Sequence, residues 1–129
     1  MKYSANKEID SINIEVDKYR PYYYAGASGD FNLIHIDNDF AKSVGLGGII
    51  LQGLCTMAYV YRAAIGNNMP DKLKKFKVRF RQTVKPLDKL TIKGKVSSLE
   101  NNLVSIDLLA ENQKGEQVIT NGCAVLDIS

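Results

Sequence analysis

The residues best suited to chemistry lie on one short polar stretch, where Asp30, Asn32 and His35 occur close together. His35 is the only histidine of the chain, and an imidazole beside a carboxylate can transfer protons near neutral pH. A long apolar segment follows and begins at Gly53. A helix that starts there would offer unpaired backbone N–H groups to an oxygen on which negative charge develops. Together these features indicate chemistry at an acyl carbonyl.

Two short helices are expected on either side of this polar stretch. The first covers about residues 18–27, with Asp17 as its N-cap, and Gly29 ends it. The second covers about residues 38–44 and is capped by Asp37. The loop between the two helices therefore carries the candidate acid and the candidate imidazole.

The apolar segment predicts a long helix over about residues 53–66, which is apolar on nearly every side and has Arg62 as its one charge. We expect this helix to be buried in the centre of the domain. Cys55 and Val60 are apolar, in addition to a stripe of side chains that recur at helical spacing: Leu54, Met57, Ala58, Tyr61, Ala64 and Ile65.

Apolar residues alternate with polar ones in a short segment near residues 9–16 and again throughout the carboxy-terminal half, which predicts strands. The four carboxy-terminal strands are expected near residues 76–81, 90–96, 104–110 and 118–128. The last is apolar on both faces, so we expect a central strand or one that a partner covers. The pattern indicates an α+β fold, with one antiparallel sheet curled over one buried helix in a single domain of residues 1–129.

Composition and charge argue against several classes of protein, including nucleic-acid-binding and membrane-spanning proteins. A net charge of +3 is too small to favour nucleic acid as a partner, and no segment is apolar for long enough to span a membrane. The charged amino terminus argues against a signal peptide. Cys55 and Cys123 lie far apart without metal-type spacing, which is typical of buried thiols in a reducing compartment. We therefore expect a soluble cytoplasmic protein that binds no metal.

The stretch YAGASGDFNLIHIDNDFA resembles the signature of the MaoC-like, or hydratase 2, family, whose members have the hot-dog fold. Gly53 matches the glycine that opens the central helix of that fold, and residues 80–96 and 112–126 are similar to the family's carboxy-terminal strands. The matching residues of the signature are Ser28, Gly29, Asp30, Asn32, Ile34, His35 and Ala41.

The resemblance implies reversible syn addition of water to a trans-2-enoyl thioester, which gives the (R)-3-hydroxyacyl product. Asp30 would take a proton from the water, and His35, which holds the same water, would help to deliver a proton to the α-carbon. The N–H of Gly53 would hold the thioester oxygen. No cofactor is implied, because coenzyme A or an acyl-carrier protein is part of the substrate.

The chain departs from the family pattern at three positions near the expected site. Leu33 stands where a proline is usual, so the loop has one restraint fewer on its backbone. Gln52 stands where a histidine often precedes the helix glycine. Tyr61 aligns with a serine near the catalytic pair, and its hydroxyl could keep that hydrogen bond to the substrate. Asn32 is expected to order the loop through its own backbone.

Two alternatives remain open. Many hot-dog proteins are thioesterases, but these commonly need a carboxylate on or near the central helix, and residues 53–66 contain none. A non-catalytic subunit that binds thioesters or dimerises would have no need of Asp30 and His35. We expect at least a homodimer, because the last strand and the adjacent tyrosines 22–24 need cover.

A row of cations could meet the phosphates of coenzyme A or an acidic carrier protein, or could simply be the solvated side of an amphipathic strand. These cations are Lys72, Lys74, Lys75, Lys77, Arg79 and Arg81.

Overall fold

The computed structural model describes residues 2–129 and contains one antiparallel sheet with three α-helices. In chain order, the elements are β1 (Ile12–Glu15), α1 (Arg20–Ser28), the 3-10 turn η1 (Leu33–His35), α2 (Asn38–Ser43), α3 (Gly53–Ile65), the 3-10 turn η2 (Pro70–Lys72), β2 (Leu73–Phe80), β3 (Lys89–Glu100), β4 (Leu103–Glu111) and β5 (Gln117–Asp127). No helix within residues 2–129 has the length and apolar character needed to cross a membrane.

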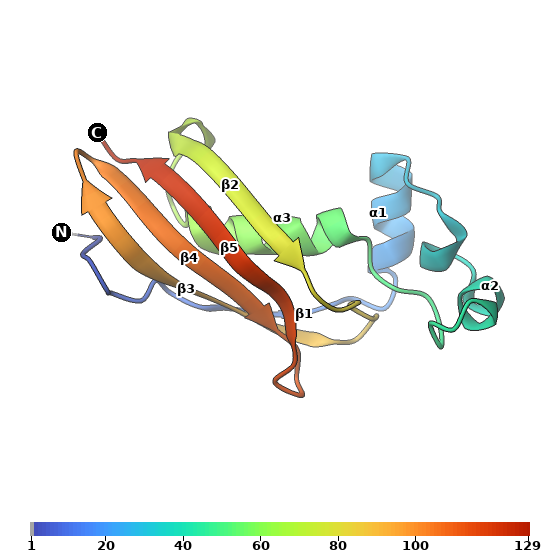
Figure 1. Cartoon of the computed structure of the whole chain (residues 1–129). Helices are drawn as coiled ribbons and strands as arrows, with labels where there is room; N and C mark the ends of the chain where they lie inside the picture. The colour runs from blue at the N-terminus through green and yellow to red at the C-terminus, as the bar shows by residue number, and fades with distance from the viewer. Residues whose placement is uncertain (1) are drawn as a thin grey trace.

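The sheet has the strand order β1-β3-β4-β5-β2, and α3 lies along one of its faces, while α1 and α2 sit beyond one end (Figure 1). This arrangement is the α+β hot-dog fold that the sequence predicted. The four carboxy-terminal strands are confirmed, but β2 lies beside β5 and not beside β3, which follows it in the chain. The predicted central position of the last strand is also confirmed, because β5 pairs with both β4 and β2.

The core lies between α3 and the concave face of the sheet, where alternate residues of the strands point inward. Its largest fully buried side chains from the sheet are Leu90, Ile92, Val96, Val104, Ile106, Val118, Ile119 and Leu126. The fully buried Val60 of α3 belongs to the same cluster. The long helix is therefore central, as the sequence predicted.

The stripe of apolar residues at helical spacing does not coincide with the buried face of α3. Leu54 is 64% exposed and Ala58 is also exposed, whereas Ala64 and Ile65 are buried. The helix is apolar on nearly every side, so its period alone could not identify the inner face. The residues that α3 buries include several small side chains, which allow the helix to approach the sheet closely: Cys55, Thr56, Tyr59, Val60, Ala63, Ala64 and Ile65.

Local signals set the helix ends near the site. Gly29 ends α1 with a left-handed φ of 79°, and its N–H donates to the Ala25 carbonyl. Asp37 caps α2 by accepting the N–H of Phe40 at 3.1 Å. The predicted N-cap Asp17 is wrong: its carboxylate accepts the N–H of Tyr19 and forms a turn, so that α1 starts at Arg20.

Candidate active site

The loop between α1 and α2 is held by short-range hydrogen bonds. The Asp30 carboxylate accepts the N–H of Asn32 at 3.3 Å, and the Asn32 side-chain oxygen accepts the N–H of Ile34 at 3.2 Å. Such bonds from a side chain to a backbone N–H two residues ahead fold the chain tightly without a helix or strand. They carry the chain from Asp30 into η1, which ends at His35.

His35 is buried, with 7% of its surface exposed, and its Nδ1 lies 2.8 Å from the Ile50 carbonyl oxygen. A carbonyl oxygen can only accept a hydrogen bond, so Nδ1 must carry the proton and donate it. In the neutral ring, Nε2 is then the nitrogen with a free lone pair. The segment before α3 thus fixes both the orientation of the imidazole and its tautomer.

Nε2 of His35 lies 3.7 Å from Oδ2 of Asp30. This distance is too long for a direct hydrogen bond, but it suits two groups that share one water molecule. The Asp30 side chain is 47% exposed, so the carboxylate is open to solvent and substrate, while the imidazole behind it is sheltered. The pair can therefore hold and polarise a water molecule between a base and an oriented ring.

A hollow of about 290 Å³ lies beside this pair, and both His35 and Gly53 line it. Asp30 is not among its lining residues, but its carboxylate lies 3.7 Å from the ring of His35, which does line the hollow. Larger hollows of about 390 and 770 Å³ lie beside the amino-terminal segment and over β3, β4 and β5, but neither includes Asp30 or His35. The smaller hollow is the one in which the imidazole meets the start of a helix.

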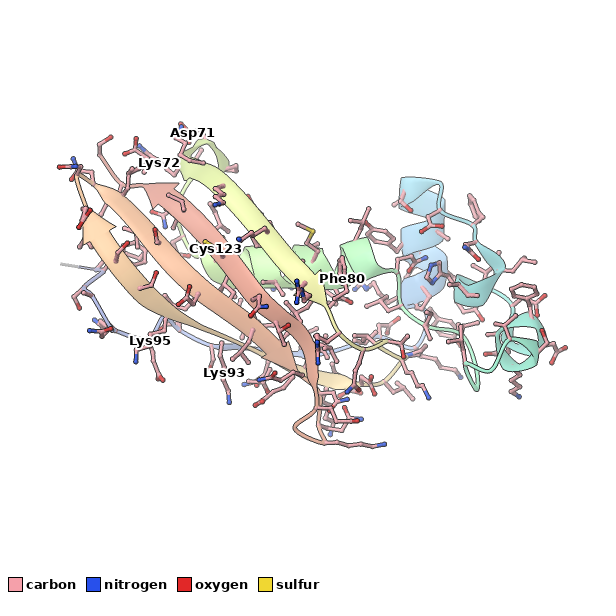
Figure 2. The ribbon with its side chains drawn as sticks, viewed as in Figure 1. Asp71, Lys72, Phe80, Lys93, Lys95 and Cys123 are labelled. Carbon is pink, nitrogen blue, oxygen red and sulfur yellow. The ribbon has the colours of Figure 1, made fainter. Side chains whose placement is uncertain are left out.

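Gly53 is the first residue of α3, where backbone N–H groups have no partner within the helix and the helix dipole favours negative charge. The position is tight for a side chain, because a Cβ built there would lie 3.3 Å from the Phe80 ring, which would have to shift slightly. Phe80 is at the end of β2, beside the start of α3 (Figure 2). An oxygen that enters the hollow can therefore approach the backbone at Gly53.

Gln52 precedes Gly53 and connects the start of α3 to α1. Its side chain is 1% exposed, and its Nε2 donates to the Pro21 carbonyl at 2.8 Å. Within residues 2–129, the side-chain oxygen Oε1 of Gln52 is buried without a hydrogen-bond partner. Gln52 therefore has a structural position behind the site and takes no part in lining the hollow.

The predicted site residues are only partly brought together. Asp30, His35 and Gly53 converge, and Asn32 orders the loop between the first two. Tyr61 does not line the hollow; it lies two turns along α3, edge-on to the Phe76 ring at 6.2 Å between centroids. Its predicted role toward the substrate remains a prediction.

Several lining residues had not been expected at the site: Thr56, Phe80, Gln82, Thr83 and Val84. Thr56 could have been inferred, because it is a polar residue that lies one turn after Gly53 on the predicted helix. The others come from the end of β2 and the segment after it, and only the tertiary fold brings them to α3. Of the predicted row of cations, Arg81 lines the hollow.

Nearby titratable groups in α1 and α3 remain protonated at neutral pH. Burial raises the pKa of the Cys55 thiol and, with help from the neighbouring Cys55, raises the pKa of Tyr59 to about 12. Burial is also the main cause that raises the pKa of Tyr24, to which Cys55 and Asp30 contribute. None of these groups supplies a thiolate or phenolate nucleophile at neutral pH, which leaves Asp30 and His35 as the pair for proton transfer.

Comparison with protein families gives a match over residues 4–118 to the MaoC like domain. Among individual relatives, the chain is 31% identical over 107 residues to a probable enoyl-CoA hydratase 2 of Dictyostelium discoideum, covering 81% of this chain and 35% of that protein. It is 29% identical over 108 residues to the fatty acid synthase beta subunit pkiC of Emericella nidulans, covering 81% of this chain and 6% of that subunit. The chain thus spans a minor part of the length of these relatives.

Solved structures agree on the fold. The R-hydratase PhaJ1 from Pseudomonas aeruginosa superposes with a TM-score of 0.85 at 20% identity, covering 97% of this chain and 82% of that one. The (R)-hydratase from A. caviae involved in PHA biosynthesis superposes with a TM-score of 0.84 at 20% identity, covering 98% of both chains.

Proposed function

Since the chain belongs to the MaoC like domain family, we propose that it is a hydro-lyase that adds water reversibly to a trans-2-enoyl thioester and forms the (R)-3-hydroxyacyl thioester. The observation that carries the proposal is the Asp30–His35 pair, whose facing atoms are 3.7 Å apart, with His35 lining a hollow that reaches Gly53. The similarity to the Dictyostelium relative, a probable enoyl-CoA hydratase 2, supports this class of reaction.

In the hydration direction, one water molecule sits between Oδ2 of Asp30 and Nε2 of His35. Asp30 takes one proton as the water oxygen attacks the β-carbon, and the hydroxyl keeps the other. His35 holds the water so that its oxygen faces the substrate, because the Ile50 carbonyl fixes the ring. The proton that Asp30 has taken then moves to the α-carbon on the same face, with the help of His35. The product thus gains both hydrogens and the oxygen of one water molecule.

The attack moves negative charge onto the thioester oxygen. In this proposal the oxygen lies at the start of α3, where the N–H of Gly53 and the helix dipole stabilise the enolate-like state. Loss of one such donor typically costs ~3 kcal/mol of transition-state stabilisation. The close approach of Phe80 to Gly53 then gives a physical reason for a glycine at this position.

The test is to incubate the protein with crotonyl-CoA while enoyl absorbance and free thiol are followed separately. Loss of the enoyl signal without thiol release is the expected result. Thiol release at the same rate would instead indicate a thioesterase, and no change in either signal across a panel of acyl chain lengths would indicate a non-catalytic subunit. Chiral analysis of the hydrated product should give the (R) isomer.

We also propose that the protein forms a homodimer through β2 and α3. Since β5 lies inside the sheet, the strands with a free edge are β1 and β2, and β2 is the longer, with eight residues against four. Beside that edge, α3 and β2 expose apolar side chains, with Leu54 64% and Phe80 50% exposed. An open strand edge next to an exposed apolar helix face is a surface that a second copy can cover.

A further inference from the structure

A second hollow, of about 350 Å³, lies next to the candidate active site, between the start of α1, the start of α2 and the connection from β2 to β3. Its side chains combine two ammonium groups, two aromatic rings and one amide: Lys18, Lys85, Tyr19, Tyr22 and Asn38. Neither the proposed chemistry nor the packing of the core uses these groups.

The two lysines enter the hollow from different elements and face no acid within it. None of the described residues that line it is acidic, and the two ion pairs found within residues 2–129 involve neither lysine. The carboxylate of Asp88 lies nearby and accepts the backbone N–H of Lys85 at 2.9 Å and the Gln113 amide at 3.0 Å, but it forms no ion pair with either lysine. The Lys18 ammonium lies 5.4 Å from the centroid of the Tyr19 ring. Two ammonium groups without an ion-pair partner in one hollow favour a ligand with phosphate groups.

The aromatic rings supply a flat apolar surface beside these charges. Tyr19 and Tyr22 are 50% and 40% exposed, so a ligand in the hollow can reach their rings. The oxygen of the Asn38 amide accepts the N–H of Ile49 at 3.0 Å, which orients the amide nitrogen as a remaining donor. Stacking on a ring, an amide donor and two cations are together the means by which proteins bind a phosphorylated nucleotide.

The two hollows are neighbours along the same pair of chain segments. Residues 48–51 and 82–86 run side by side, joined by a hydrogen bond of 2.7 Å from the Leu51 N–H to the Val84 carbonyl. Leu51 and Val84 line the candidate active site, whereas Ile49 and Lys85 line the second hollow. At ~3.5 Å per residue of extended chain, the hollows are separated by on the order of 10 Å. A flexible arm between an acyl thioester and a nucleotide can span such a distance.

We propose that the second hollow binds the phosphorylated nucleotide of coenzyme A, so that the substrate is a coenzyme A thioester. A carrier-protein thioester has the same flexible arm but no nucleotide, and it would leave Lys18, Lys85 and the two rings without a ligand. This inference rests on the proposed function for the acyl part of the substrate, but the nucleotide site itself can be tested without catalysis.

The first test is calorimetric titration of the full chain with adenosine 3′,5′-bisphosphate. The wild type should bind it, and Lys18→Ala and Lys85→Ala should each weaken binding by about tenfold, as expected for loss of a charge-assisted contact. The matched control is Lys95→Ala, which removes a lysine from the outer face of β3 (Figure 2) and should bind like the wild type. Absence of binding by the wild type, or equal binding by all variants, would overturn the nucleotide site.

The second test compares crotonyl-CoA with crotonyl-pantetheine. In Lys18→Ala and Lys85→Ala, kcat/KM for the coenzyme A thioester should fall about tenfold relative to kcat/KM for the pantetheine thioester. An unchanged ratio would contradict the inference even if hydration is observed. A wild type that binds the nucleotide but hydrates neither thioester would contradict the proposed function and leave the nucleotide site standing.

Discussion

Nε2 of His35 faces Oδ2 of Asp30 at 3.7 Å, while Nδ1 of the same ring lies 2.8 Å from the Ile50 carbonyl oxygen. The contact with Ile50 determines which ring nitrogen carries the proton, and therefore what the other nitrogen can do beside Asp30. Because the carbonyl requires a proton on Nδ1, the neutral ring presents a lone pair toward the carboxylate. A water molecule beside these two acceptors can donate one hydrogen to each of them.

The tautomer of His35 is the first testable consequence. In the folded protein above the pH at which the ring is charged, the proton should reside on Nδ1, although free histidine prefers Nε2. Since the chain has one histidine, nitrogen-15 NMR of the ring can be assigned without mutants. The same sample unfolded in urea is the control and should show the Nε2–H form. A folded protein with its proton on Nε2 would contradict the shared-water geometry.

A second prediction concerns the buried Gln52, whose amide donates to the Pro21 carbonyl. Gln52→Glu replaces the amide with a carboxyl, and burial should raise the pKa of that carboxyl above its value of about 4.3 in the unfolded chain. Below about pH 4.3 the carboxyl is neutral and can donate to the Pro21 carbonyl, so the free energy of unfolding should stay close to the wild-type value. As pH rises through the raised pKa the variant should lose ~1.4 kcal/mol for each unit by which that pKa is raised.

Urea unfolding of Gln52→Glu and the wild type at several pH values measures this difference. Gln52→Leu is the control, because it removes the donor without adding a charge and should cost about 1–3 kcal/mol at every pH. If the difference in free energy of unfolding between Gln52→Glu and the wild type did not change with pH, the result would contradict the buried position of Gln52.

The proposed dimer gives a third prediction. Leu54 is exposed on α3 beside β2, and Leu54→Asp would place a charge in the contact between two copies. Association should weaken by about 30-fold or more, which corresponds to ~2 kcal/mol for an interface residue that carries much of the binding energy. Light scattering at micromolar concentration should show a dimer for the wild type and a monomer for the variant.

The control for this experiment is Leu103→Asp, which changes an apolar residue with 42% exposure at the start of β4, away from the β2 edge. It should remain dimeric. A monomeric wild type would contradict the proposed dimer. If Leu103→Asp dissociated while Leu54→Asp did not, the interface would lie elsewhere on the surface.

The features that the sequence predicts well are those fixed by local chemistry. The glycine that ends α1, the aspartate that caps α2 and the alternating strands each depend on a few neighbouring residues. The spacing of Asp30 and His35 is likewise local, because side-chain bonds to the nearby backbone N–H groups fold the loop between them.

The features that the sequence does not reveal depend on contacts between distant segments. No local signal links Phe80 to Gly53 or the Ile50 carbonyl to His35. The first contact joins β2 to the start of α3, and the second forms where the segment before α3 packs against η1. The inner face of α3 could not be identified either, because residues on both sides are apolar and the choice depends on which fit against the sheet.

The central claim is that Asp30 activates the water, and the rate of Asp30→Asn tests it most directly. The variant keeps the shape of the side chain but cannot take a proton, so kcat/KM for hydration of crotonyl-CoA should fall by about 10²–10⁴-fold. Asp39→Asn, which changes an exposed acid in the first turn of α2, is the matched control and should keep the wild-type rate. Circular dichroism should show that both variants are folded. An Asp30→Asn variant that hydrates crotonyl-CoA at the wild-type rate would contradict the mechanism.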